Sequence, residues 1–176
     1  MIIIMPEPMS TALFAARVGF FLTRYSSYAF NKRKQDDKSV RKWISTNLES
    51  YRSSIMEVME RAHRKDNKDL AHSMKRLLDE IDMFKNDSYL AETGVKGQFF
   101  SSKSAASSTS LDKLIEYDAL IMEDITKGGK ALEHLLKAMS AGENGIESSA
   151  DDIVTHFISS RSKFRDRIKY IKGFGD

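Results

Sequence analysis

The chain has 176 residues, of which 41% are apolar and 30% are charged, with a net charge of +3 and no cysteine. The absence of cysteine excludes disulfides, zinc–thiolate sites and thiol chemistry. The length is sufficient for one domain with a sizeable core, which needs neither disulfides nor a structural metal. We therefore expect a single helical-bundle domain over residues 1–176, with residues 1–9 as an N-terminal tail.

The first predicted helix follows the only two prolines and runs from Ser10, as N-cap, to about Asn31. Apolar side chains cover most of its circumference, so this helix is either central in a bundle or laid against a partner protein or a membrane surface. Both interpretations remain open from the sequence. The candidate interaction surface on and just after this helix consists of Phe14, Arg17, Phe20, Phe21, Arg24, Tyr28, Lys32, Arg33 and Lys34.

The next two predicted helices form an antiparallel hairpin. One extends over about Lys38 to Arg64, and the other begins after the polar turn Arg64 to Asn67 and weakens after Asn86. Apolar residues recur at spacings of four and three on both sides of that short turn, which is the pattern of two helices packed side by side.

Residues Gly94 to Ser110 form the one long irregular stretch of the sequence, rich in serine and alanine from Ser101 onward. A connection of this length either crosses the end of the bundle or is mobile. A fourth helix is expected from about Ser110 to Ala141. Its adjacent Gly128 and Gly129 are tolerable where another backbone approaches closely or where the helix bends.

The fifth predicted helix, about Ile146 to Lys172, has the most regular heptad pattern, with Arg161 in place of an apolar residue. The fold class is therefore all-α: an antiparallel bundle of about five long helices with coiled-coil-like heptad packing. A cation at Arg161 needs a carboxylate from another helix or another subunit, and the second possibility would favour self-association.

No catalytic, nucleotide or metal motif stands out, so we expect no enzyme, no catalytic residue, no cofactor and no metal. Two carboxylate–histidine pairs, Glu60 with His63 and Asp69 with His72, have a spacing that occurs in di-iron bundles. Both pairs lie off the apolar seams and beside a turn, whereas a metal site needs ligands that point inward.

Helix five also carries a cluster of cations near its end. Either these residues bind phosphate or another anion, or they are solvated cations at a helix C-terminus, where positive charge is favoured. This candidate anion patch consists of Arg161, Lys163, Arg165, Arg167, Lys169 and Lys172.

Over about Ser10 to Asn86 the layout resembles that of peripheral membrane-remodelling proteins of the ESCRT-III and phage-shock type, in which a basic leading helix precedes a long hairpin. The resemblance implies a role at a membrane surface. A membrane span is not expected, because Arg17 and Arg24 interrupt the most apolar stretch. We expect a cytoplasmic scaffold or assembly subunit that acts by protein–protein contact, as a homo-oligomer or with a protein partner. The alternatives are a nucleic-acid-binding or packaging protein and a protein of anionic membrane surfaces.

Overall fold

The computed structural model describes residues 11–91 and 108–173, and every regular element in these two stretches is an α-helix. The five helices are α1 (Thr11–Phe21), α2 (Arg33–Arg64), α3 (Lys68–Leu90), α4 (Ser108–Ala141) and α5 (Glu147–Ile171). The predicted all-α helical bundle is therefore confirmed. Residues 1–9 and most of the stretch 94–110 lie outside the described residues.

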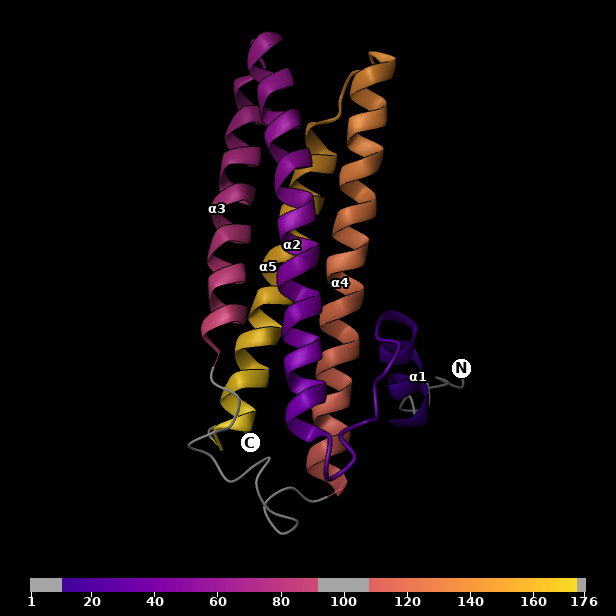
Figure 1. Ribbon diagram of the computed structural model, residues 1–176. Helices are drawn as coiled ribbons and strands as arrows, with labels where there is room; N and C mark the ends of the chain where they lie inside the picture. The colour runs from indigo at the N-terminus through magenta and orange to yellow at the C-terminus, as the bar shows by residue number, and fades with distance from the viewer. Residues whose placement is uncertain (1–10, 92–107, 174–176) are drawn as a thin grey trace, which may run out of the picture.

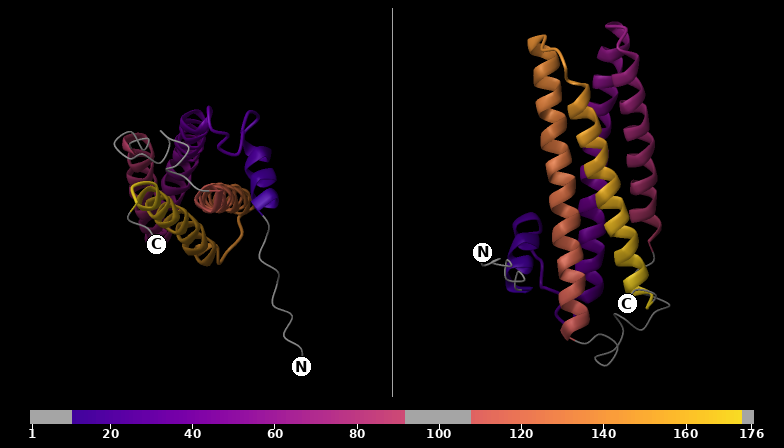
Figure 2. Two further views of the ribbon diagram at one scale, coloured as in Figure 1. Left: turned by 90° about the horizontal axis from the view of Figure 1, so that it is seen from below. Right: turned by 180° about the vertical axis from the view of Figure 1, so that it is seen from behind.

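Four long helices run alternately up and down and form the body of the bundle (Figure 1). α2 packs against α3 and α4 packs against α5, while α3 also contacts α5 and α2 contacts α4. The order around the bundle is therefore α2, α3, α5, α4, as the view along the axis indicates (Figure 2). The hairpin of α2 and α3 turns where expected, because the side chain of Asn67 accepts a hydrogen bond of 3.1 Å from the backbone N–H of Leu70 and caps α3.

The core follows the apolar seams of the four long helices. Burying these side chains removes apolar surface from water, which is the main stabilising contribution in a domain of this size. Its largest fully buried apolar side chains are Phe84, Phe157, Phe164, Ile44, Leu48, Ile55, Leu70, Met74, Leu77 and Ile81.

α1 differs most from the sequence-based expectation. It ends at Phe21, ten residues before Asn31, and α2 begins at Arg33 instead of Lys38. It is also not central: α1 lies outside the four long helices and packs mainly along α4 (Figures 1 and 2). The physical reason lies between the two helices, where Ser27 and Tyr28 adopt positive φ values of 55° and 61° that no α-helix accommodates.

Candidate interaction surface

The segment that follows α1 is fixed to the first turn of α2 by the buried carboxylate of Asp36. This carboxylate accepts hydrogen bonds from the backbone N–H of Tyr28 at 2.8 Å and from the hydroxyl of Ser26 at 2.6 Å. The Nε–H of Arg33 donates in turn to the carbonyl of Tyr28 at 3.2 Å. These bonds stabilise the left-handed backbone at Ser27 and Tyr28, which would otherwise cost about 1–2 kcal/mol for each residue.

A buried charge cluster then attaches Tyr28 to the bundle. Arg167 of α5 is fully buried, and its Nε donates to Oδ1 of Asp118 on α4 at 2.6 Å. Its Nη2 donates to the hydroxyl of Tyr28 at 2.8 Å, and this hydroxyl donates to Oδ2 of Asp118. Its Nη1 lies 2.8 Å from Oδ1 of Asp37 on α2, an ion pair that is not aligned as a hydrogen bond. The cluster therefore joins α2, α4 and α5 to the segment behind α1.

The enclosed position of this cluster changes the acidity of its members. Burial raises the pKa of Asp118 to about 6, against the opposing effects of Arg167 and Tyr28. Burial and the charge of Asp118 also raise the pKa of Tyr25, whose ring meets that of Tyr28 edge to face. A shifted carboxyl group can mark a catalytic acid. Here both oxygens of Asp118 are bonded to Arg167 and Tyr28, and the group is sealed from solvent, so a structural role accounts for the shift.

α1 itself docks through its inward side. Val18 is fully buried, and the ring of Phe21 packs against Trp43 of α2 with centroids 5.2 Å apart. Arg17, the one charged residue of α1, forms a two-pronged ion pair with Glu123 of α4. The position of α1 is thus fixed by apolar packing, to which Phe14 and Ala15 also contribute, together with this aromatic contact and ion pair.

The outward side of α1 is apolar and exposed. Phe20 is 86% exposed and Leu13 is 56% exposed, at positions seven residues apart and therefore on one face of the helix. The small residues Ala12, Ala16 and Gly19 are exposed with them. We call these five residues the α1 face. It carries no charged group, which is unusual for a surface helix.

The predicted interaction surface around helix one is only partly accessible. Tyr28 and Arg33 are buried, while Phe14, Arg17 and Phe21 are half-buried against α4 and α2. The exposed members of the predicted set are Phe20, Arg24, Lys32 and Lys34. The nine residues therefore do not form one continuous face, because the chain bends sharply between Phe21 and Arg33.

The six cations predicted as an anion patch on α5 are also dispersed. Arg167 lies in the core, and Arg161 is 9% exposed. Lys163 forms an ion pair with Asp124 of α4, and Lys169 lies 3.6 Å from Asp166 of its own helix. Arg165 and Lys172 are exposed. Most of the positive charge of α5 is therefore directed at carboxylates of the same chain.

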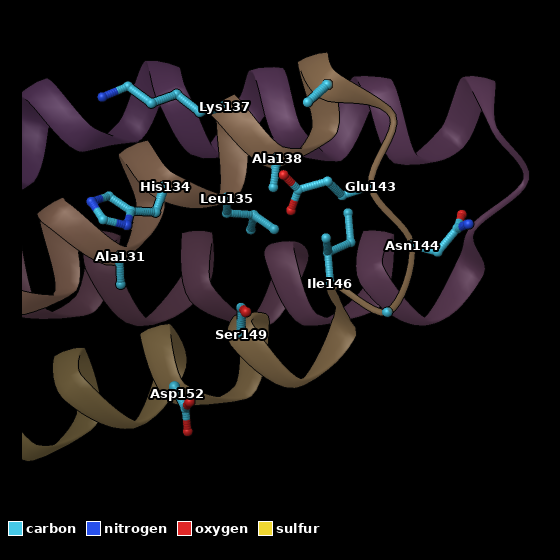
Figure 3. A pocket seen from close by; sticks show the side chains of 12 residues that line it. Ala131, His134, Leu135, Lys137, Ala138, Glu143, Asn144, Ile146, Ser149 and Asp152 are labelled. Atoms are coloured by element: carbon cyan, nitrogen blue, oxygen red, sulfur yellow. The ribbon is translucent and has the colours of Figure 1, made fainter.

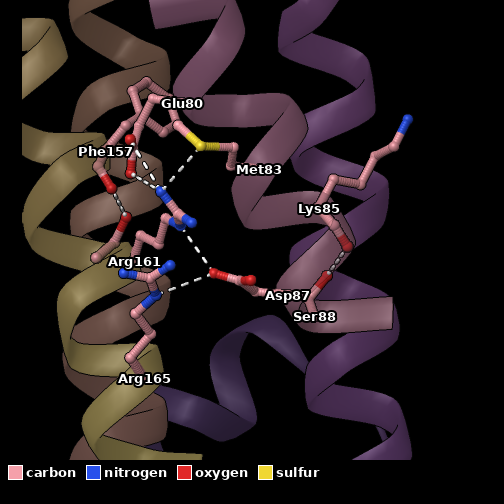
Figure 4. A network of polar contacts seen from close by, with 9 residues as sticks. Glu80, Met83, Lys85, Asp87, Ser88, Phe157, Arg161 and Arg165 are labelled. Carbon is pink, nitrogen blue, oxygen red and sulfur yellow. Dashed lines mark hydrogen bonds and ion pairs between the residues drawn. The ribbon is translucent and has the colours of Figure 1, made fainter. Parts of the chain in front are cut away.

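Arg161 finds its carboxylates within the chain (Figure 4). Its Nε donates to Asp87 of α3 at 2.8 Å, and its Nη1 lies 3.2 Å from Glu80 of the same helix. Asp87 also accepts from Nε of Arg165 at 3.2 Å. Since the cation in the seam of α5 is satisfied by α3, it no longer serves as an argument for self-association.

Gly128 and Gly129 lie where aromatic rings pack against α4. A Cβ atom on Gly128 would lie 2.7 Å from Cε2 of the buried Phe157. A Cβ atom on Gly129 would collide with the ring of Tyr51, which is half-buried. The close approach at these positions is thus made by side chains of α5 and α2, and not by another backbone.

A cavity of about 790 Å³ lies between the end of α4 and the start of α5 (Figure 3). Its lining carries charges of both signs, with His134 and Lys137 on α4, Glu143 in the connecting loop and Asp152 on α5. The side chains of His134 and Asp152 lie apart in the view. This mixture selects no single class of ligand.

The carboxylate–histidine pairs near the turn between α2 and α3 do not converge. His63 and His72 are both exposed, and Glu60 is engaged by Arg64 one turn further on. Within residues 11–91 and 108–173, no three potential metal-ligating side chains are grouped.

The sequence contained one signal for the buried cluster that was missed. Along α5 the buried residues Phe157, Ser160, Phe164, Arg167 and Ile171 follow spacings of three and four, so Arg167 occupies a seam position. Asp118 has the same relation to the buried Leu114 and Ile121 on α4. Charged residues on the inward seams of three helices, with Asp37 on α2, indicate a buried ion cluster.

In the described part of the chain, no helix combines the length and the apolar character needed to cross a bilayer. Comparison of the chain with protein-family models, with curated proteins and with solved structures finds no match.

Proposed function

We propose that this protein is a non-enzymatic assembly subunit, and that it associates with a second copy of itself through the α1 face. The observation that carries the proposal is the exposure of Phe20, at 86%, on a helix face without any charge. Burying a phenylalanine side chain contributes a free energy of about 1.5–3 kcal/mol. Covering this exposed ring with a second copy of the protein is therefore favourable.

The arrangement of large and small side chains on the α1 face is complementary to the same face of a second copy. Bulky Leu13 and Phe20 stand near the two ends of the face, and small residues lie between them. In an antiparallel pairing across a twofold axis at Ala16, Phe20 of each copy lies opposite Ala12 of the other, and Leu13 lies opposite Gly19. The single cation of α1, Arg17, is turned inward to Glu123, so the pairing buries no unpaired charge.

The size of the surface limits the strength of this contact. Eleven residues of helix span about 16 Å, which places the interface at the small end of specific contacts. We therefore expect weak self-association that depends on concentration. The ion pair to Glu123 and the Phe21–Trp43 contact hold α1 in place beforehand, which lowers the entropy lost on association.

Sedimentation equilibrium over a wide concentration range tests the proposal. The mass of the unaltered protein should rise from 20.0 kDa toward twice that value as concentration increases. Phe20→Ser should remain monomeric without unfolding, because the ring is exposed. Ile158→Ser is the matched control. Ile158 is 45% exposed but lies on α5, away from the α1 face, so the Ile158→Ser variant should still form the dimer.

Three results would contradict the proposal. A mass of 20.0 kDa at every concentration would exclude self-association. A dimer that survives Phe20→Ser would place the contact elsewhere. Co-sedimentation of the monomer with lipid vesicles, lost in Phe20→Ser and kept in Ile158→Ser, would assign the face to a membrane surface instead.

A further inference from the structure

A second surface, independent of the α1 face, lies where the first half of α2 meets the end of α3. Lys34, Lys38 and Lys42 are all exposed and lie four residues apart. Their spacing places them on one side of α2, with about 6 Å of helix axis between successive lysines. Among the ion pairs found in the described residues, none includes these three lysines.

The lysines form one wall of a groove of about 470 Å³. The other wall comes from Ser88 and Tyr89 of α3, and Tyr89 is 80% exposed. The lining carries four cations and no carboxylate; it consists of Lys34, Lys38, Arg41, Lys42, Ser45, Ser88 and Tyr89.

Two features define the shape and charge of this groove. Arg41 is held between the walls, because its Nε donates to Oδ2 of the buried Asp37 at 3.0 Å and its Nη1 donates to the carbonyl of Ser88 at 3.5 Å. A second hollow of about 590 Å³ shares Ser45 and Tyr89 with the first. That hollow also contains the carboxylate of Glu49, which pairs with Lys85, so the part of this surface without a carboxylate is the 470 Å³ groove.

The position of the lysines in the fold shows that they are not cations placed at the C-terminal end of a helix. From the sequence, the basic run at residues 32–34 is predicted to lie at the C-terminal end of a helix, where the helix dipole favours cations. In the structure, Lys34 stands in the first turn of α2 and Lys38 in the second. Positive charge is unfavourable at that end of a helix, so the arrangement is not helix capping.

We propose that this groove binds single-stranded nucleic acid, with the three lysines at successive phosphates and a base stacked on Tyr89. Regularly spaced cations beside an exposed aromatic ring are the two components of sites that bind single strands without sequence preference. A concave groove suits an extended chain better than it suits the flat surface of a membrane. The residues differ from those of the α1 face, so either proposal can fail alone.

Fluorescence anisotropy with a labelled polythymidine oligonucleotide, titrated at several salt concentrations, tests this inference. The logarithm of the association constant should fall linearly with the logarithm of salt. Replacing Lys34, Lys38 and Lys42 together by Gln should reduce the slope by about 2. Tyr89→Ala should weaken binding about tenfold, and Tyr89→Phe should retain most of the affinity because it keeps the ring.

The matched control replaces Lys127, Lys130 and Lys137 by Gln. These lysines are exposed on α4, so the variant has the same net charge as the groove variant with the groove intact. It should retain the salt slope of the unaltered protein. An equal reduction of the salt slope in both triple variants would show general charge attraction and overturn the proposal. Absence of binding at low salt would also overturn the proposal. So would an affinity for anionic vesicles that exceeds the affinity for the oligonucleotide and does not change in Tyr89→Ala.

Discussion

The guanidinium of Arg167 and the carboxylate of Asp37 form an ion pair of 2.8 Å in which neither side chain is accessible to solvent. Asp118 is buried on the other side of the same guanidinium. Removing this cation leaves Asp118 enclosed in the core without a counter-charge and leaves Asp37 with only its ion pair to Arg41. The stability of the bundle therefore depends on Arg167 far more than on the exposed cations of α5.

We expect Arg167→Met to lower the free energy of unfolding by about 3–5 kcal/mol, the usual cost of breaking a buried pair by removing one partner. Arg165→Met is the control, because Arg165 is 57% exposed in its side chain and its pair with Asp87 should contribute less than about 1 kcal/mol. Urea unfolding of the two variants measures the difference. Equal losses would contradict a structural role for the cluster.

Asp118 gives the protein a pH dependence of defined sign. Burial raises the pKa of this carboxyl to about 6 from its ordinary value of 3.8, so between these values the folded state retains a proton that the unfolded state has lost. The contribution of Asp118 to stability is therefore present at low pH and is lost as pH rises through about 6. The loss amounts to about 3 kcal/mol.

Asp118→Asn isolates this effect, since amide and carboxyl have similar shape and the amide does not titrate. Unfolding free energies of both proteins from pH 4 to pH 7 should diverge, with the unaltered protein losing stability relative to the variant as pH rises. Parallel profiles would show that Asp118 titrates normally.

The two glycines of α4 should respond differently to the same substitution. Gly128→Ala should cost about 1–3 kcal/mol, because the facing ring of Phe157 is fully buried and has no space to move. Gly129→Ala should cost less, since Tyr51 is half-buried, and the loss of its edge contact with Phe157 is offset by the helix preference of alanine, about 1 kcal/mol. Thermal unfolding compares the two, and a larger loss at Gly129 would reverse this interpretation of the rings.

Replacing Arg161 should lower the stability of the fold without changing self-association. Arg161→Met should lower the unfolding free energy by about 1.5–3 kcal/mol, because Glu80 and Asp87 lose charge-assisted hydrogen bonds. Its sedimentation mass should match that of the unaltered protein at every concentration, as its partners lie in the same chain. A change in mass would show that Arg161 also acts between subunits.

The sequence was sufficient for the elements whose apolar spacing and caps agree. The hairpin of α2 and α3 follows from apolar residues spaced by four and three on both sides of the short polar turn Arg64 to Asn67, which are local features. α1 was predicted too long because Tyr25 and Tyr28 continue its aromatic spacing. The break at Ser27 and Tyr28 is imposed by Asp36, and by Asp118 and Arg167, which lie 90 and 139 residues from Tyr28. No local pattern contains that information.

The candidate surfaces were foreseen only in part for a related reason. Phe20 was included in the predicted surface, but a helix that is apolar on all sides gives no indication of which side faces the bundle. Lys38 and Lys42 were not singled out, because the predicted helix boundary placed the neighbouring basic run at a helix end. Tyr89 lines the groove only because α3 brings it beside α2.

The buried charge cluster has a consequence for the order of folding. Most contacts of this bundle join neighbours in the chain, as in the hairpins of α2 with α3 and of α4 with α5, and contacts of this kind form rapidly. Arg167, by contrast, reaches Asp118 across 49 residues and Tyr28 across 139. We expect the two hairpins to form first and the cluster to close only when they meet, so that substitutions at Arg167 accelerate unfolding while leaving the folding rate almost unchanged.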